Sequence, residues 1–596
     1  MVARLIERFR TGVEQAVGAV LAALLGLLLC LVLANVVARY VFHAGFIGQE
    51  ELGIWLHLAL ISLSLPLAFR GPLAMRFDVL NRLLPEQARL CAEVLADGIS
   101  TIAALVLLSG AVGTIASIGG MSPTLGLPEW IRFAFVAVGA ILLLLMLILD
   151  RLAEKKHLRL AVSLILASFF YWGSRSVQFE TEWSPSIYMA VLAGVGLLSG
   201  APLAHAFLAA ACLAMSFRSS LTEPALVSST VNGMSRFLLL AIPFFLLAGS
   251  LLTLSGAAER LVTFAASLVG HRRGGLAQTV LLTSVIFSGA SGSSVANAAF
   301  GASTFQPQLV RNGYPPAQAG AIIAASSVLD NVIPPSIAFL LLAAATNISV
   351  GSLLAGGFVA GALMALCLAV AIRLSVKGGA SRKVASVRER WRAAHAAIPA
   401  FGLGIIVVFG IRFGIVTPTE AAALAAGFTF LLALAGKRRG AEIFSSLRQS
   451  ALEAGAIGIL IGSAAPFAFL LAVDGVSEQL TGLVHAFGSS PWTVLLVANL
   501  ILLVAGLILD IGAAILLLGP ILLPAAAAAG IDPIHFGVIL VVNLMIHGLT
   551  PPLGILIYVV SGVTAIPPAD LFRAALPYLA ALLVALVLLC AGTLLF

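Results

Sequence analysis

Hydrophobic residues in this chain form long continuous runs, rather than the alternation of a β-strand or the one-sided stripe of a soluble helix. Four runs fill the first 150 residues, at about 16–38, 52–69, 98–118 and 131–150. A fifth lies at about 160–173, and a larger apolar block extends from about 187 to 596. Because a helix needs about 20 apolar residues to cross a bilayer, the pattern predicts an all-α polytopic membrane protein. Continuous runs exclude a membrane β-barrel, whose strands alternate.

Lysine and arginine gather in a few of the polar loops between these runs. The basic segments are 4–10, 70–89, 151–159, 373–395 and 437–448. The positive-inside rule places these segments in the cytoplasm, so both ends of the first four-helix block are predicted there. The polar and acidic stretch 174–186, SRSVQFETEWSPS, is predicted to lie outside. The amphipathic segment 70–97 is suited to the membrane interface.

The large apolar block contains a repeat at a fixed spacing. The segment 307–335, shifted by 217 residues without a gap, falls on the segment 524–552. Each segment holds seven Gly or Pro residues and six of them coincide, which makes chance agreement implausible. The same frame puts Gly289 on Gly506 and Ser293 on Asp510. The sequence therefore predicts two structurally related halves.

Each half carries a double proline inside an apolar run, Pro334–Pro335 and Pro551–Pro552. Such a break frees backbone carbonyl and amide groups, which a membrane tolerates only where they line a cavity. Matching segments interrupted by Gly and Pro in two halves indicate the binding site of a secondary transporter. The pattern therefore predicts ion or substrate binding at the breaks.

Polar side chains accompany these breaks. The stretch FSGASGSSVANAAFG, 287–301, suits a helical hairpin that dips into the membrane, with close helix packing as the alternative reading. A carboxylate substrate prefers the N-termini of half-helices, where the backbone carries partial positive charge. Na⁺ prefers oxygen ligands, and backbone carbonyls of the unwound turns are joined there by the side-chain oxygens of Ser293, Ser294, Ser327, Asn331, Asp510 and Thr550.

Three ionisable side chains lie near the breaks. Asp510 is a functional candidate because a charge in lipid is costly, and a hydrogen-bonded structural aspartate is the alternative. Asp330 either takes part in a site or faces a water-filled vestibule. His547 matches Asp330 in the repeat frame, and a structural role is favoured there over proton coupling.

The composition narrows the function further. The chain has 596 residues, of which 61% are hydrophobic and 10% charged, against about 25% charged in soluble proteins. The net charge of +8 reflects cytoplasmic loops facing membrane lipid and does not indicate nucleic acid. No GxxxxGK[ST] motif binds ATP, and no His or Cys cluster has metal-ligand spacing. We therefore expect no enzyme activity and no organic cofactor.

Several long motifs resemble one family of transporters. The matching stretches of the large block include LLAIPFFLLAGSLL (239–252), FSGASGSSVANAA (287–299), GIVTPTEAAALAA (414–426) and TPPLGILIYVVSGV (550–563). The first block carries NVVARYVF (35–42), GQEELGIWL (48–56) and MSPTLGLPEWI (121–131). The chain resembles the membrane components of TRAP transporters, the tripartite ATP-independent periplasmic systems, with the small Q-type and large M-type subunits fused.

The resemblance implies a mechanism and a domain plan. It implies Na⁺-coupled import of an organic acid, a carboxylate, which a periplasmic substrate-binding protein delivers at the bacterial inner membrane. It implies an inverted-repeat elevator carrier with two hairpins and broken helices. The expected domains are a four-helix module at 1–157, a connecting helix and linker at 158–186, and a transporter module at 187–596 with repeats at about 187–376 and 397–596.

The resemblance also assigns candidate site residues, with one Na⁺ expected at each pair of hairpin and broken helix. Substrate binding is expected at Ser291, Ser293, Ser294, Asn297 and Asn331. Na⁺ binding is expected at Gly289, Gly292, Ser327, Asp330, Pro334, Gly506, Asp510, Gly512, Asn543, Gly548, Thr550 and Pro551. Asp330 and Asn331 depart from the family, which often has Gly-Pro or other small residues before the IPPS motif.

Three other hypotheses remain open on the sequence. A standalone Na⁺/carboxylate symporter would share the architecture, but it would need no module such as the first 150 residues. A membrane receptor or assembly protein would need no duplicated broken helices. An enzyme is disfavoured because no catalytic constellation is present.

Overall fold

The computed structural model describes most of the chain as helices. The described residues are 2–69, 74–76, 84–180, 182–217, 221–271, 274–291, 293–376, 384–476, 479, 482, 490–507, 509–551 and 554–592. Within them, eleven helices are long and apolar enough to cross a membrane, which confirms the prediction of an all-helical polytopic protein. The contacts group the chain into a first unit, Met1–Pro243 with Leu447–Leu480, and a second unit, Phe244–Ser446 with Thr481–Phe596.

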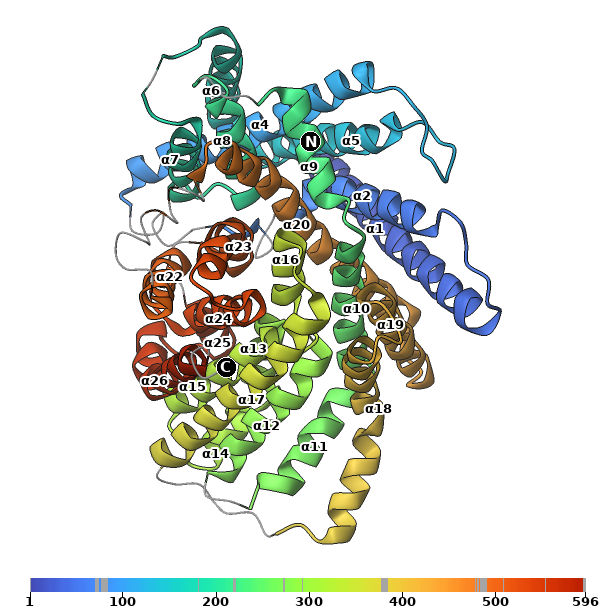
Figure 1. The fold of residues 1–596 in the computed structure, drawn as a ribbon, viewed down its shortest axis with the longest axis vertical. Helices are drawn as coiled ribbons and strands as arrows, with labels where there is room; N and C mark the ends of the chain where they lie inside the picture. The colour runs from blue at the N-terminus through green and yellow to red at the C-terminus, as the bar shows by residue number, and fades with distance from the viewer. Residues whose placement is uncertain are drawn as a thin grey trace. The chain divides into compact units, whose positions relative to one another are not determined.

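The first unit begins with the expected four helices. They are α1 (Val2–Val41), α2 (Gln49–Ala68), α4 (Glu86–Ser117) and α5 (Trp130–Ala153), and α6 (His157–Ser176) follows. Helix α5 packs against both α2 and α4 (Figure 1). The part of 70–97 that the structure describes is mostly helical. From Glu86 onward it belongs to α4, because the apolar stretch beyond residue 97 continues the same helix without a break.

A short helical hairpin follows in the same unit. It consists of α7 (Pro185–Leu198) and α8 (Leu203–Ala214), which pack against each other and against α4. At the base of the hairpin, the Phe179 amide donates to the Ser216 carbonyl, and the Ser216 hydroxyl donates to the Ser174 carbonyl. At about 1.5 Å per residue, neither helix spans a bilayer alone. The hairpin therefore enters and leaves near the C-terminal end of α6.

Further helices belong to the first unit, and one of them packs on α4. Helix α9 (Glu223–Met234) and the short η2 (Phe237–Leu240) precede α10 (Ala241–Leu254), which continues into the second unit. Gly110 on α4 allows α9 to approach, because a Cβ there would collide with Val227 and the Glu223 backbone. From Leu447, the later part of α20 (Gly440–Val473) also belongs to this unit.

The second unit contains two matching series of helices. The first is α12 (Gly275–Ser291), α13 (Ser294–Thr304), α15 (Pro316–Ser327), α16 (Ile337–Thr346) and α17 (Val350–Ser375). The second is α22 (Pro491–Gly506), α23 (Ile511–Ala528), α24 (Pro533–Ile546), α25 (Ile555–Thr564) and α26 (Pro568–Gly592). Starts of the first series at 275, 294, 316, 337 and 350, shifted by 217, become 492, 511, 533, 554 and 567, each within one residue of its counterpart.

The repeated frame extends beyond the segment in which the sequence shows it. Shifted by the same 217 residues, the start of α8 becomes 420, against 418 for α19 (Pro418–Ala435). The start of α9 becomes 440, which is where α20 starts. The second unit also holds α11 (Ala257–Val269), α14 (Gln306–Arg311) and α18 (Val387–Arg412), and α18 packs on α11 and α19.

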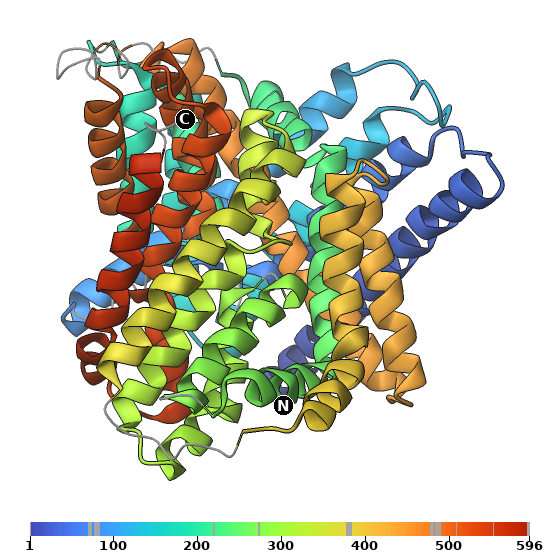
Figure 2. The same cartoon turned by 60° about the horizontal axis from the view of Figure 1, so that its bottom comes forward.

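The two series of the second unit pack reciprocally. Helix α13 contacts α25, and its counterpart α23 contacts α16, the counterpart of α25 (Figure 1). The long helices α17 and α26 also contact each other (Figure 2). Each hairpin therefore packs against the broken helix of the other repeat, as a two-fold arrangement of the repeats requires.

Candidate functional site

The first hairpin places a polar turn beside the first broken helix. Helices α12 and α13 meet at the turn, where Ser293 is the N-cap of α13 and its hydroxyl accepts from the Ala296 amide at 3.3 Å. Gly289 and Ser291 belong to the last turn of α12. The predicted Na⁺ residue Gly292 lies outside the described residues. Residues 287–301 therefore comprise the end of α12 and most of α13.

The first helix break follows α15 directly. A 3₁₀ turn, η3 (Val328–Asn331), leads into residues without helical structure, and α16 starts at Ile337. Ser336 joins the two sides, because its hydroxyl donates to the Asn331 carbonyl and accepts from the Phe339 amide. The double proline prevents the helix from continuing, and a serine side chain satisfies groups that the break exposes.

Asp330 lies at the centre of this break. Its side chain has no exposed surface, and neither carboxylate oxygen has a hydrogen bond of normal geometry. The hydroxyl of Ser288 on α12 and the amide of Asn297 on α13 lie close enough to interact with it electrostatically. An ionised carboxylate buried in this way is costly unless a cation or a set of donors compensates its charge.

Other polar atoms near Asp330 also lack partners. The Asn297 amide nitrogen and the Ser294 hydroxyl on α13 are buried without hydrogen bonds, and so is the Ser326 hydroxyl on α15. Ser327 differs, because its hydroxyl donates to the Ile323 carbonyl at 2.9 Å. Asn331 is only partly buried. Because buried polar groups in native proteins are normally paired, these unpaired oxygen and nitrogen atoms on the elements around the break indicate a site for a polar ligand.

In the second repeat, Asp510 caps a helix. It is the N-cap of α23, and its carboxylate accepts from the Gly512 amide at 2.9 Å. The side chain is half-buried rather than enclosed. This geometry explains why an aspartate follows α22, since Asp is among the best N-cap residues. One oxygen in the cap still leaves the carboxylate able to bind a cation, because an ionised carboxylate has several lone pairs.

Asn543 and His547 hold the second broken helix against α22. The Asn543 amide donates to the side-chain oxygen of Asn499 at 2.7 Å. His547 Nε2 lies 2.9 Å from the Leu503 carbonyl, while its Nδ1 is buried without a partner. Gly506 lets α22 approach, because a Cβ there would collide with the imidazole of His547.

The remaining predicted residues surround the double prolines. The turn η4 (His547–Leu549) ends at Thr550, whose hydroxyl donates to the His547 carbonyl at 3.2 Å. Gly548 is buried and Pro551 is exposed. Pro334 is buried and lines a cavity of about 180 Å³ between α17 and α18.

Three residues of the site were missed on the sequence. Ser288 is fully buried beside Asp330 and belongs to the same small-residue stretch, 287–301, as the predicted residue Ser293. Ser326 immediately precedes the predicted residue Ser327 but was not itself predicted. Asn499 is a lone amide in an apolar run, and this polarity was the available signal for it.

The two breaks therefore differ chemically although their backbones repeat. The first surrounds a buried carboxylate with unpaired side-chain oxygen and nitrogen atoms, while the second uses an imidazole and an amide to bind a neighbouring helix. Within the described residues, no group of three or more His, Cys, Asp or Glu is arranged to hold a metal ion. The donors at the first break are hydroxyl, amide and carboxylate, which suit a hard monovalent cation rather than a transition metal.

Comparisons with known proteins cover nearly the whole chain. Residues 187–594 match the family model of the tripartite ATP-independent periplasmic transporter, DctM component. Residues 28–157 match the model of the DctQ component of the same transporters. The boundary between the two matches lies beside the connecting helix α6.

Two curated relatives illustrate the similarity. The sialic acid TRAP transporter permease protein SiaT of Haemophilus influenzae (strain 86-028NP) is 29% identical over 588 residues, which cover 93% of both chains. The C4-dicarboxylate TRAP transporter large permease protein DctM of Pseudomonas aeruginosa is 39% identical over 363 residues, covering 59% of this chain and 83% of that protein. Among solved structures, the Alcanivorax borkumensis YdaH transporter aligns at 15% identity and a TM-score of 0.43, over 61% of this chain and 86% of its own.

Proposed function

Because this chain belongs to the tripartite ATP-independent periplasmic transporter family, with its DctQ and DctM components in one polypeptide, we propose that it imports an organic acid by Na⁺ symport. It is a multi-pass membrane permease and not an enzyme. The proposed location is the bacterial inner membrane. The proposed substrate is a carboxylate, since relatives are named for C4-dicarboxylates and sialic acid.

The observation that carries the proposal is the polar cluster at the first break. Asp330 is enclosed with both oxygens unpaired, and Ser294, Asn297 and Ser326 add further buried polar atoms without partners. A Na⁺ ion bound there would neutralise the carboxylate and accept ligands from hydroxyl and carbonyl oxygens. The binding free energy of Na⁺ then depends on the conformation of the break. Such a dependence is required for ion binding to be coupled to a conformational change.

The carboxylate substrate would bind at the N-terminal end of α13. There Ser293 and Ser294 begin a half-helix whose free amides carry partial positive charge, and Asn297 lies one turn further on. Asn297 also interacts with Asp330, so one side chain is placed to sense both the ion and the substrate. This shared contact gives a physical route by which one occupant favours the other.

The reciprocal packing of the two repeats supports an elevator mechanism. Since α13 leans on α25 and α23 leans on α16, neither hairpin is free to move without the broken helix of the other repeat. We propose this interlocked bundle as the transport domain that carries ion and substrate together. A periplasmic substrate-binding protein is the proposed donor of substrate, as the family description of a tripartite periplasmic system implies.

Uptake by proteoliposomes tests the proposal. The purified chain is reconstituted, and uptake of labelled organic acids is measured with an inward Na⁺ gradient, a K⁺ gradient or none, with and without a periplasmic substrate-binding protein of this transporter family. Uptake is expected only when Na⁺ and the binding protein are both present. Uptake with Na⁺ alone would instead identify a standalone symporter, and no flux with any acid would contradict transport.

Two substitutions of Asp510 distinguish its role as the N-cap of α23 from a role as a Na⁺ ligand. Asparagine caps a helix as well as aspartate does, so Asp510→Asn keeps the N-cap, whereas Asp510→Ala is expected to cost about 1 kcal/mol of stability. If Asp510 also binds Na⁺, both variants raise the Na⁺ concentration for half-maximal uptake. Thermal unfolding and Na⁺ titration of uptake measure the two effects. A normal Na⁺ response in Asp510→Asn would restrict this residue to capping.

A further inference from the structure

A cavity of the first unit is lined by several charged side chains. It has a volume of about 380 Å³ and lies between the ends of α2, α4, α5 and α6 and the tip of the α7–α8 hairpin. Arg151 at the end of α5, Lys156 just before α6 and Arg159 at its start belong to the basic segment 151–159, which the positive-inside rule places in the cytoplasm. The cavity is therefore expected at the level of the lipid headgroups in the cytoplasmic leaflet.

The wall of this cavity is positively charged. Among the described residues, five basic and three acidic side chains line it, namely Arg76, Arg89, Arg151, Lys156 and Arg159 against Glu93, Asp97 and Asp150, which leaves an excess of two positive charges. Two further charges pair with this wall, Glu154 with Lys156 and Arg10 with Asp150. These two cancel, so the excess remains and favours an anionic occupant.

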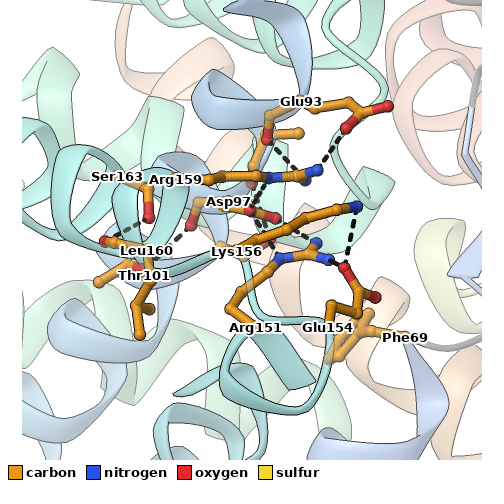
Figure 3. A network of polar contacts seen from close by, with 12 residues as sticks. Phe69, Glu93, Asp97, Thr101, Arg151, Glu154, Lys156, Arg159, Leu160 and Ser163 are labelled. Carbon is orange, nitrogen blue, oxygen red and sulfur yellow. Dashed lines mark hydrogen bonds and ion pairs between the residues drawn. The ribbon is translucent and has the colours of Figure 1, made fainter. Parts of the chain in front are cut away.

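An ion-pair network holds the basic groups in place (Figure 3). Asp97 accepts from Arg151 at 2.7 and 2.8 Å and from Arg159 at 2.6 Å. Glu154 binds both Arg151 and Lys156, and these hydrogen bonds and charges lower its pKa although burial acts to raise it. Arg89 and Lys156 lie at the edge, with about half of each side chain exposed.

One buried ring nitrogen on this wall makes no hydrogen bond. His205, at the start of α8, has no exposed surface, and its Nε2 makes no hydrogen bond. Its Nδ1 lies 2.9 Å from the Ser100 hydroxyl, which itself donates to the Ala96 carbonyl. Nδ1 must therefore be the donor in that pair, so Nε2 of the neutral ring is an acceptor for a hydroxyl or ammonium group.

Some of the same helices also line an apolar cavity. A second cavity of about 200 Å³ is lined by α4, α6, α7 and α8, and its walls are almost wholly apolar. Along α6, its residues Leu166 and Phe170 lie 7 and 11 positions beyond Arg159, or roughly 10–16 Å at 1.5 Å per residue. Both side chains are exposed, as on a surface that faces lipid. A basic cavity at headgroup level and an apolar cavity on some of the same helices have the form of a phospholipid site.

We propose that this site binds one anionic glycerophospholipid of the phosphatidylglycerol type. Its phosphodiester lies between Arg89, Lys156 and Arg159, a hydroxyl of its headgroup donates to His205 Nε2, and an acyl chain occupies the apolar cavity. The lipid joins α4 and α6 to the α7–α8 hairpin. The proposal is independent of Na⁺ coupling and of the transported substrate.

Lipid retention by the purified full chain tests the site. After delipidation, native mass spectrometry measures binding of phosphatidylglycerol, phosphatidylethanolamine and phosphatidylcholine. Each basic residue near an anionic lipid contributes about fivefold to binding, so Arg89→Gln with Lys156→Gln is expected to weaken phosphatidylglycerol binding about thirtyfold. Lys155→Gln is the control, because it removes a neighbouring charge that does not line the cavity. Equal effects of control and double variant would overturn the proposal.

Two further comparisons distinguish the parts of the ligand. Phosphatidylmethanol has the phosphodiester but no headgroup hydroxyl, so wild type should prefer phosphatidylglycerol to it and His205→Leu should lose that preference. Free glycerol 3-phosphate lacks acyl chains and should not compete. Equal binding of phosphatidylethanolamine, or full competition by glycerol 3-phosphate, would contradict an anionic lipid site.

Discussion

Asp330→Asn is expected to abolish Na⁺-driven uptake while leaving the protein folded. The carboxylate is enclosed and interacts only with the neutral Ser288 hydroxyl and Asn297 amide, so a bound cation is the partner that would balance its charge. Removing one member of a buried charge pair typically costs 3–5 kcal/mol, which corresponds to on the order of a hundredfold or more in Na⁺ affinity. Na⁺ titration of uptake and of thermal stability measures the loss.

In the absence of Na⁺, Asp330→Asn is expected to stabilise the protein rather than impair it. The wild-type chain then holds an uncompensated buried carboxylate, whereas asparagine at position 330 carries no charge and donates to neighbouring oxygens. Asp330→Asn should therefore unfold at a higher temperature than wild type in Na⁺-free buffer, and adding Na⁺ should stabilise only the wild type. This reversal distinguishes an ion site from a merely structural aspartate.

Asp532→Asn is the matched control for this experiment. Asp532 is exposed and caps α24 through the His535 amide at 2.9 Å, and asparagine preserves such a cap. Its Na⁺ response and uptake should equal those of the wild type. A normal Na⁺ response in Asp330→Asn would remove Asp330 from the coupling site and leave the unpaired cluster without its proposed ligand.

Gly506→Val is expected to reduce uptake to background because it displaces the second break. A Cβ at position 506 would collide with His547, which binds the Leu503 carbonyl and holds η4 against α22. Overpacking of this kind usually costs about 1–3 kcal/mol, and here it also displaces the break. Uptake and thermal unfolding of the same preparation separate a shifted site from a general loss of fold.

Gly562→Val provides the comparison for this prediction. Gly562 lies in α25, and a Cβ there would meet no atom within 4 Å. Valine is a better helix residue than glycine, so this variant should be at least as stable as the wild type and transport normally. Full activity of Gly506→Val would show that the close approach of α22 and His547 is not required for transport.

The local architecture was largely predictable from the sequence. Uninterrupted apolar runs predict the membrane helices, and the frame of six coinciding Gly and Pro residues predicts two related halves. The double prolines indicate that each half contains a helix break, although α15 and α24 end at Ser327 and Ile546, several residues before them. The family could also be recognised, since its long motifs are read directly along the chain.

The roles of individual polar residues were less predictable. Asp510 and Asp330 are both intramembrane aspartates in the sequence, yet one caps α23 and the other is enclosed without partners. Asn543 and Thr550 are equally suited to bind an ion, but the Thr550 hydroxyl donates to the His547 carbonyl, whereas Asn543 donates its amide to Asn499 and keeps its side-chain oxygen without a partner. Residue type and spacing specify which chemistry is possible, while the neighbouring helix decides which atoms are already paired.

Long-range packing separates what the sequence contains from what the fold alone decides. Breaks, caps and apolar runs arise from interactions within a few residues, so the linear pattern records them. The reciprocal contacts of α13 with α25 and α23 with α16, and the cavity that joins Arg89 to His205, bring together residues more than a hundred positions apart. No local periodicity encodes such pairs, because they follow from how the helices pack side by side.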